Sequence, residues 1–153
     1  MTESIIIGAD HAGFPLKEGL KGFLAERGLD VVDVGTYNGD PVDYPDFGRR
    51  VAESVSSGSV KRGILVCGSG VGMSITANRF PGVRGALCLD EDMARLSRMH
   101  NNSNVLILAG RKTDIETAKG IVKTWLETDF EGGRHQARLD KIKAIEEERI
   151  KGC

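Results

Sequence analysis

A cysteine beside a glycine-rich run is the most reactive pattern in the sequence. Cys67 ends a short apolar segment and precedes the run GSGVG at residues 68–72. Glycines permit close backbone approach, and successive N–H groups at the start of a helix can bind an anion. A helix start also lowers the pKa of a nearby thiol. The pattern therefore predicts an anion site with a thiolate that serves as nucleophile or base.

The same residues have other interpretations. The run is also consistent with a plain tight turn between a strand and a helix, and Cys67 with a small buried apolar residue. A dinucleotide site is a third possibility, because Asp90 lies about 20 residues downstream, as that fingerprint requires. Against it, Met73 stands where the third glycine should be, and the run follows the third predicted strand instead of the first.

Two of the three histidines lie in segments that we expect near the carboxyl ends of strands. His11 follows Asp10 after the first apolar run, and His100 ends a predicted helix and precedes Asn101. Imidazole exchanges a proton close to neutral pH, so both are candidates for acid–base chemistry or substrate binding. A solvated surface histidine is the alternative for each.

Arginines supply candidate ligands for a phosphate. Arg134 and Arg138 are four residues apart and so share a helix face, with His135 between them. Together these side chains could hold a phosphate, although the many charges that follow also fit a solvated helix face. Arg111, just after the fifth apolar run, is a further candidate.

Other chemistries lack their patterns. No CxxC or HExxH spacing is present, so we predict no metal and no cofactor. Ser69 does not lie in the GxSxG pattern of a serine hydrolase. Three cysteines do not make a disulfide framework, and Cys88 and Cys153 are interpreted as a core residue and an incidental terminal residue.

Composition fits one ordinary domain over residues 1–153. Hydrophobic residues make up 40% and charged residues 28% of the chain, and 21 Lys and Arg balance 22 Asp and Glu. This balance argues against a nucleic-acid partner.

The start of the chain lacks the features of a secretory leader. The apolar runs of the chain are too short for a membrane span, so we expect a cytoplasmic protein with no membrane partner.

Five apolar runs predict strands, and helical patterns separate them. The predicted strands are residues 4–8, 31–35, 63–68, 85–89 and 104–109. The first predicted helix has Pro15 in its first turn and ends before Gly28. A loop at 36–46 precedes the second helix, at about 47–57, and the third helix begins near Met73. The last three predicted helices cover 92–99, 115–126 and about 135–150.

Continuous apolar strands that alternate with helices indicate an α/β fold, a three-layer α/β/α sandwich with a five-stranded parallel, Rossmann-like sheet. If strands two and three flank strand one, a ligand site opens between strands one and three, beyond their carboxyl ends. The order of strands four and five stays open. The last helix carries an apolar stripe that predicts packing on its own chain or on a partner subunit, formed by Leu139, Ile142, Ile145 and Ile150.

Five segments, in one order along the chain, resemble the type B ribose-5-phosphate isomerases: IIIGADHAGFPLKE, DVGTY…DYPDFG, GILVCGSGVGMSITANRFPGVRGALC, MHNNSNVLILAGR and GGRHQARLDKI. The resemblance implies interconversion of ribose 5-phosphate and ribulose 5-phosphate through an enediolate, a step of the pentose phosphate pathway. It also implies a metal-free reaction and a homodimer or homotetramer whose active sites combine residues of two subunits.

The resemblance also implies individual roles. Cys67 corresponds to the catalytic cysteine, and Ser69 stands where many members have threonine. Asp10 and His100 correspond to residues linked to sugar binding and ring opening. The implied substrate-binding and phosphate-binding residues are His11, Tyr44, Gly68, Gly70, Val71, Gly72, Asn101, Arg111, Arg134 and Arg138.

Two alternatives to this function remain open in the sequence. One is an isomerase for a 6-phosphohexose, allose 6-phosphate or galactose 6-phosphate, since one extra hydroxymethyl group is a small steric difference. The other is a sugar-phosphate-binding or redox-sensing protein without turnover. Cys67, Ser69 and His100 together favour an enzyme, because a binding protein needs no base.

Overall fold

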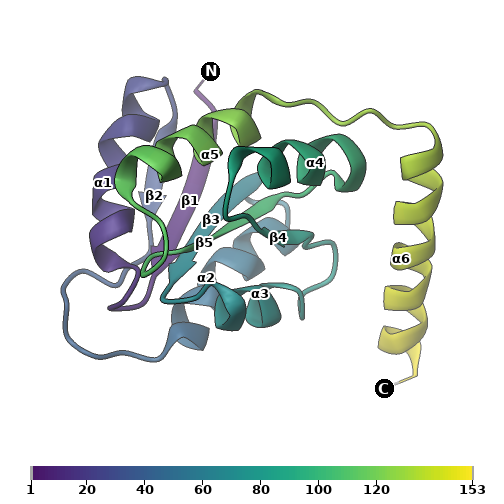
Figure 1. The fold of residues 1–153 in the computed structure, drawn as a ribbon. Coiled ribbons are helices and arrows are strands. Elements are labelled where there is room, and N and C mark those ends of the chain that lie inside the picture. Colours follow the sequence, from purple (N-terminus) through teal and green to yellow (C-terminus); the bar gives the residue numbers. More distant parts are fainter. Residues whose placement is uncertain (1, 153) are drawn as a thin grey trace.

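Five parallel strands form one sheet at the centre of the computed structural model, which describes residues 2–152 (Figure 1). They are β1 (Ser4–Ala9), β2 (Asp30–Asp33), β3 (Arg62–Cys67), β4 (Gly85–Leu87) and β5 (Val105–Ala109). Their order in the sheet is β2-β1-β3-β5-β4. β1 therefore lies between β2 and β3, which confirms the predicted switch point, and the order left open is resolved with β4 at the edge.

Helices cover both faces of the sheet. The helices of the chain are α1 (Phe14–Glu26), α2 (Tyr44–Ser56), α3 (Val71–Ala77), α4 (Glu91–Asn101), α5 (Ile115–Glu127) and α6 (Arg134–Lys151), and the first five of them cover the sheet. One apolar core joins the sheet to α1, α4 and α5, and a second joins it to α2 and α3. The structure is therefore the predicted three-layer α/β/α sandwich.

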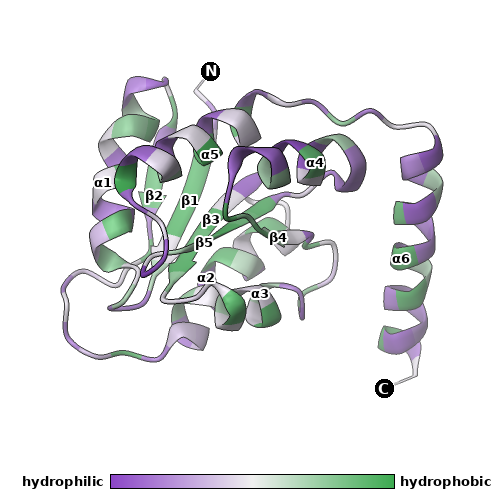
Figure 2. Cartoon of the chain, viewed as in Figure 1, coloured by the Kyte–Doolittle hydropathy of each residue, from purple (hydrophilic) through white to green (hydrophobic). Residues whose placement is uncertain are grey.

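The central strands are apolar because both of their faces are covered. β5 is buried along its whole length, and β1 and β3 are buried except at their first residues. Figure 2 shows these strands in green, the colour of hydrophobic residues. The edge strand β2 instead alternates between exposed and half-buried residues.

Several predicted boundaries were wrong by a few residues. α2 begins at Tyr44, inside the segment predicted as a loop, because Asp43 is extended at the N-cap and Pro45 suits a first turn. α3 begins at Val71 instead of near Met73, since Gly70 takes a φ of +79° at its N-cap. β4 ends at Leu87, so Cys88 lies just beyond the strand, although it is fully buried.

α6 lies beside the rest of the molecule, at the side nearest β4 (Figure 1). Of its apolar stripe, Leu139 is buried, whereas Ile142, Ile145 and Ile150 are 52%, 60% and 56% exposed. Most of the stripe is thus uncovered within one chain. Among the described residues, no helix has both the length and the apolar character needed to cross a membrane.

Candidate active site

The loops after β1, β3 and β5 meet at the carboxyl edge of the sheet. The register pairs Ala9 with Val66 and Cys67 with Ala109. Beyond these pairs, the amide of Asp10 donates to the carbonyl of Val66 at 3.2 Å, and the amide of Gly110 donates to the carbonyl of Cys67 at 2.7 Å. Asp10 and Cys67 therefore belong to one set of connected loops, as the switch-point argument predicts.

Two glycines allow these loops to touch. A Cβ atom on Gly13 would lie 2.3 Å from the Val66 carbonyl oxygen, and one on Gly110 would lie 2.9 Å from the Ala12 carbonyl oxygen. The Gly13 amide also donates to Asp10 Oδ1 at 2.9 Å, which fixes this buried carboxylate. The backbone contacts hold the loops in one arrangement.

Cys67 is 4% exposed and directly precedes the turn into α3. Gly70 makes the turn, and a Cβ there would lie 2.4 Å from Leu87 Cδ1. The amide of Val71 donates to Ser69 Oγ at 3.3 Å. The first amides of a helix have no intrahelical acceptor, so they can donate to an anion beside the thiol.

Two further candidates pack on the same glycine run. A Cβ on Gly72 would lie 2.5 Å from Cζ of the Tyr44 ring, and one on Gly68 would lie 3.3 Å from a terminal guanidinium nitrogen of Arg111. Tyr44 therefore lies over the start of α3, and Arg111 lies beside the residue after Cys67. Both are exposed enough to meet a ligand.

His11 completes this side of the site. Its Nδ1 accepts a hydrogen bond from the amide of Val42 at 3.1 Å. This bond leaves the proton of a neutral ring on Nε2, which becomes a donor suited to phosphate oxygens. His11 also lines an open cleft of about 850 Å³ with Asp43 and Arg50 among its walls.

His100 and Asn101 lie at the opposite, amino edge of the sheet, so the expectation that His100 faces the carboxyl ends is wrong for a single chain. Asn102, which follows them, is bound at this edge. Arg84, which directly precedes β4, donates from Nε to the carbonyl of Asn102 at 2.7 Å. β5 separates the two edges by four steps of about 3.3 Å, roughly 13 Å. A helix between parallel strands runs back across the sheet, and this rule could have placed His100 correctly.

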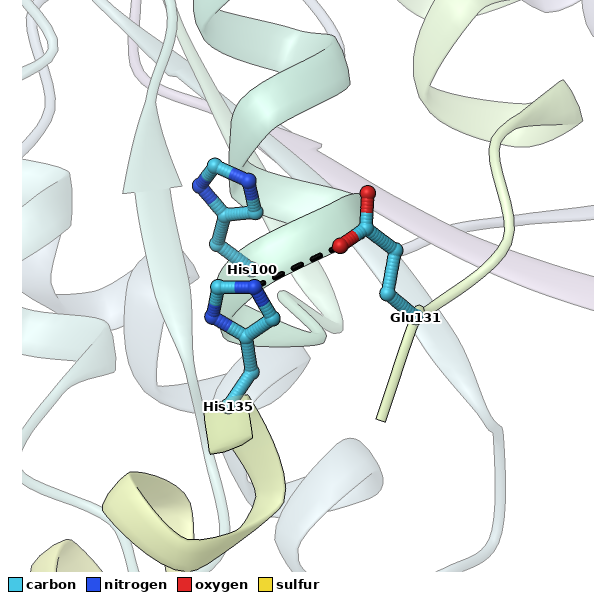
Figure 3. A group of neighbouring side chains, drawn as sticks. All are labelled: His100, Glu131 and His135. Atoms are coloured by element: carbon cyan, nitrogen blue, oxygen red, sulfur yellow. Dashed lines mark ion pairs between the residues drawn. The ribbon is translucent and has the colours of Figure 1, made fainter. Parts of the chain in front are cut away.

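His135 turns away from the expected arginine clamp. Its ring is buried and stacks on His100 with centroids 4.3 Å apart, while its Nε2 lies 3.4 Å from Glu131 Oε2 (Figure 3). Arg134 and Arg138 stay exposed on the first turns of α6. Glu131 was missed in the sequence because nothing in its spacing links it to His100.

The predicted site residues therefore form two groups. The carboxyl-edge group consists of Asp10, His11, Tyr44, residues 67–72 and Arg111. The amino-edge group consists of His100, Asn101, Arg134 and Arg138, on α4 and α6. Figure 1 shows α6 well apart from the loops that follow β1 and β3. One chain does not bring the two groups together.

The second described cysteine has a different environment. Burial raises the pKa of the Cys88 thiol to about 11. We therefore expect Cys88 to stay unmodified when the native protein is treated with iodoacetamide at pH 8, because only about one thiol in a thousand is ionised there. Mass spectrometry of the peptides checks this. Modification of Cys88 as fast as in unfolded protein would contradict it.

A parallel sheet with a thiol and a glycine-rich turn beside its switch point defines an α/β protein of the kind that places its ligand site beyond the carboxyl ends of the strands. Residues 5–142 match the family model described as Ribose/Galactose Isomerase, and the chain belongs to this family. It is 47% identical to ribose-5-phosphate isomerase B of Escherichia coli (strain K12) over 147 residues, 96% of this chain and 99% of that protein.

Solved structures agree with this assignment. Ribose-5-phosphate isomerase B of Clostridium thermocellum has a TM-score of 0.94 and 49% identity, covering 95% of this chain and 99% of its own. The protein of the same name from Mycoplasma genitalium, with bound ribulose-5-phosphate, has a TM-score of 0.93 and 43% identity, covering 97% and 99%. The resemblance seen in the sequence and the predicted fold are both confirmed.

Proposed function

We propose that this chain is an aldose–ketose isomerase that interconverts ribose 5-phosphate and ribulose 5-phosphate. Membership of the family and the near-full-length similarity to isomerases of this name support the activity. The observation that carries the chemistry is the position of Cys67 directly before the turn into α3. A base and a set of oxyanion donors then lie on one short segment, and the reaction needs both.

The reaction moves one proton between two carbons. We assign Cys67 as the base that removes the proton from C2 of the open-chain aldose, and the electron pair moves through the new C1–C2 double bond onto O1. Amides of residues 68–72 stabilise the resulting enediolate, and Ser69 donates a further hydrogen bond. The thiol then returns the proton to C1 while the O2 proton moves to O1, which yields the ketose.

The remaining candidates hold the substrate and open its ring. We assign the phosphate to His11, Arg111, Arg134 and Arg138, because charge-assisted donors suit phosphate oxygens. Asp10, Tyr44 and Asn101 bind the sugar, and His100 exchanges a proton with the ring oxygen during ring opening. Binding of the remote phosphate fixes the reacting carbons beside Cys67.

The separation of the two groups supports a site built from two chains. We infer a homodimer, alone or within a tetramer, in which the carboxyl-edge group of one chain meets the amino-edge group of the other. A two-fold axis makes both sites equivalent. The exposed Ile142, Ile145 and Ile150 provide an apolar surface for the contact.

Both described cysteines are free, which agrees with a reducing cytoplasm.

A substrate comparison tests the proposed function. We expect turnover of ribose 5-phosphate with kcat/KM at least about tenfold above that of allose 6-phosphate or galactose 6-phosphate, since one misplaced carbon costs about 1–3 kcal/mol. A coupled assay on the purified protein measures all three. Preference for a 6-phosphohexose would establish the hexose alternative, and binding without turnover of any of them would leave a sugar-phosphate-binding protein.

A further inference from the structure

Three potential metal ligands meet where α4 ends and α6 begins (Figure 3). The rings of His100 and His135 stack with their planes 14° from parallel, and Glu131 forms an ion pair with His135. One ligand atom from each side chain lies within 4.8 Å of the other two. Two imidazoles and a carboxylate, from three separate positions along the chain, thus gather at one point.

We propose that His100, Glu131 and His135 form a binding site for Zn²⁺ or a similar transition-metal ion. Two histidines and one glutamate are a ligand set of open zinc sites, which keep the fourth position for water. Imidazole suits zinc, copper and nickel, whereas Mg²⁺ requires oxygen ligands. The cluster is therefore selective for a transition metal over Mg²⁺.

A small rearrangement lets the three side chains share one ion. Zinc bonds of about 2.0–2.2 Å place tetrahedral ligand atoms roughly 3.4 Å apart. His135 Nε2 and Glu131 Oε2 already lie 3.4 Å apart, and a ligand atom of His100 lies within 4.8 Å of the ligand atoms of both residues. The nitrogen lone pairs of each imidazole lie in the plane of its ring. Because the two stacked rings are nearly parallel, their lone pairs do not point to a common ion, so one ring has to turn. His135 is buried and stays in place. His100 is half-buried at the last turn of α4 and Glu131 is exposed, so both can move.

Metal binding here has a consequence for catalysis, which rests on the proposed function. His100 opens the sugar ring only while its nitrogen is free to exchange a proton, and a bound ion occupies that nitrogen. Arg134, assigned to the phosphate, directly precedes His135 in α6. Zinc at this site therefore inhibits the isomerase, and a chelator restores activity.

Calorimetry with Zn²⁺ alone, on the intact protein, tests the site. We expect wild-type protein to bind zinc but not Mg²⁺, and Glu131→Gln to bind zinc at least about tenfold more weakly. Asp129→Asn is the matched control, because it removes the same charge from the same exposed linker outside the cluster. It should bind zinc, and be inhibited by it, as the wild type is.

Co²⁺ as a spectroscopic probe separates this site from the thiol of Cys67. We expect visible absorption bands of a nitrogen- and oxygen-ligated ion and no sulfur-to-cobalt charge-transfer band. Equal zinc affinity in wild type and Glu131→Gln, or a sulfur band, would overturn the proposal. If the protein fails to turn over ribose 5-phosphate but Glu131→Gln weakens zinc binding, the metal site stands and only the proposed function fails.

Discussion

Replacing Cys67 with alanine is expected to lower kcat at least about 10²-fold while sugar-phosphate affinity stays close to wild type. The substitution removes the thiol that we assign as the base, directly before the turn into α3. It leaves His11 and Arg111, the residues that we assign to the phosphate on this side, unchanged, so we expect the affinity for the phosphate to remain. Cys67→Ser should be nearly as slow, because a hydroxyl is a much weaker acid than a thiol.

Steady-state kinetics together with calorimetric titration of the sugar phosphate measure both effects. Cys88→Ala is the control, since it removes the other described free cysteine from a core position away from the glycine run. It should change the stability of the fold more than kcat. Near-wild-type turnover in Cys67→Ala, with intact binding, would refute the thiolate mechanism and point to Asp10 or a histidine as the base.

Mixing two inactive variants is expected to restore about one quarter of the wild-type activity. Cys67→Ala disables the carboxyl-edge group, and Arg138→Ala disables the amino-edge group. If each site combines one group from each chain, half of the randomly formed dimers are hybrids, and each hybrid holds one intact site and one doubly altered site. Neither variant alone can form an intact site.

The measurement needs proof that the subunits exchange. Differently tagged chains, mixed under conditions that dissociate the subunits and then purified on both tags, give pure hybrids, which should have about one half of the wild-type activity because one of their two sites is intact. A matched mixture of Cys67→Ala with a second carboxyl-edge variant, Arg111→Ala, should stay inactive, because the hybrid sites all carry one defect or the other. No recovery in proven Cys67–Arg138 hybrids means that each chain builds its own site.

The sheet could be predicted because its signals are local. Continuous Ile and Val runs predict buried strands wherever they occur. The residues of the loops after β1 and β3 can be identified as well, because they directly follow two of these runs in the sequence. Tyr44 was placed in a loop because the start of α2 depends on the extended Asp43, which residue types do not reveal. Helix and strand ends shift by a few residues for the same reason.

The division of the site could not be read from residue types. Asp10 and Cys67 are close because neighbouring strands end together, a relation that strand order supplies. His100, although similar in type and context, lies at the other edge because α4 crosses the sheet before it ends. The contact between His100 and His135 joins two helices separated by β5 and α5, and only the folded chain brings them together.

Gly13 and Gly110 also limit how the substrate range of this protein can change during evolution. A side chain at either position would collide with backbone, which unlike a side chain cannot turn aside. These two positions in the loops of the carboxyl edge are therefore closed to gradual mutation, and we expect a library that varies them to yield mainly misfolded chains. We expect adaptation to a longer or shorter sugar phosphate to use the exposed loop at residues 37–41 or, in the proposed dimer, the amino-edge group of the second chain.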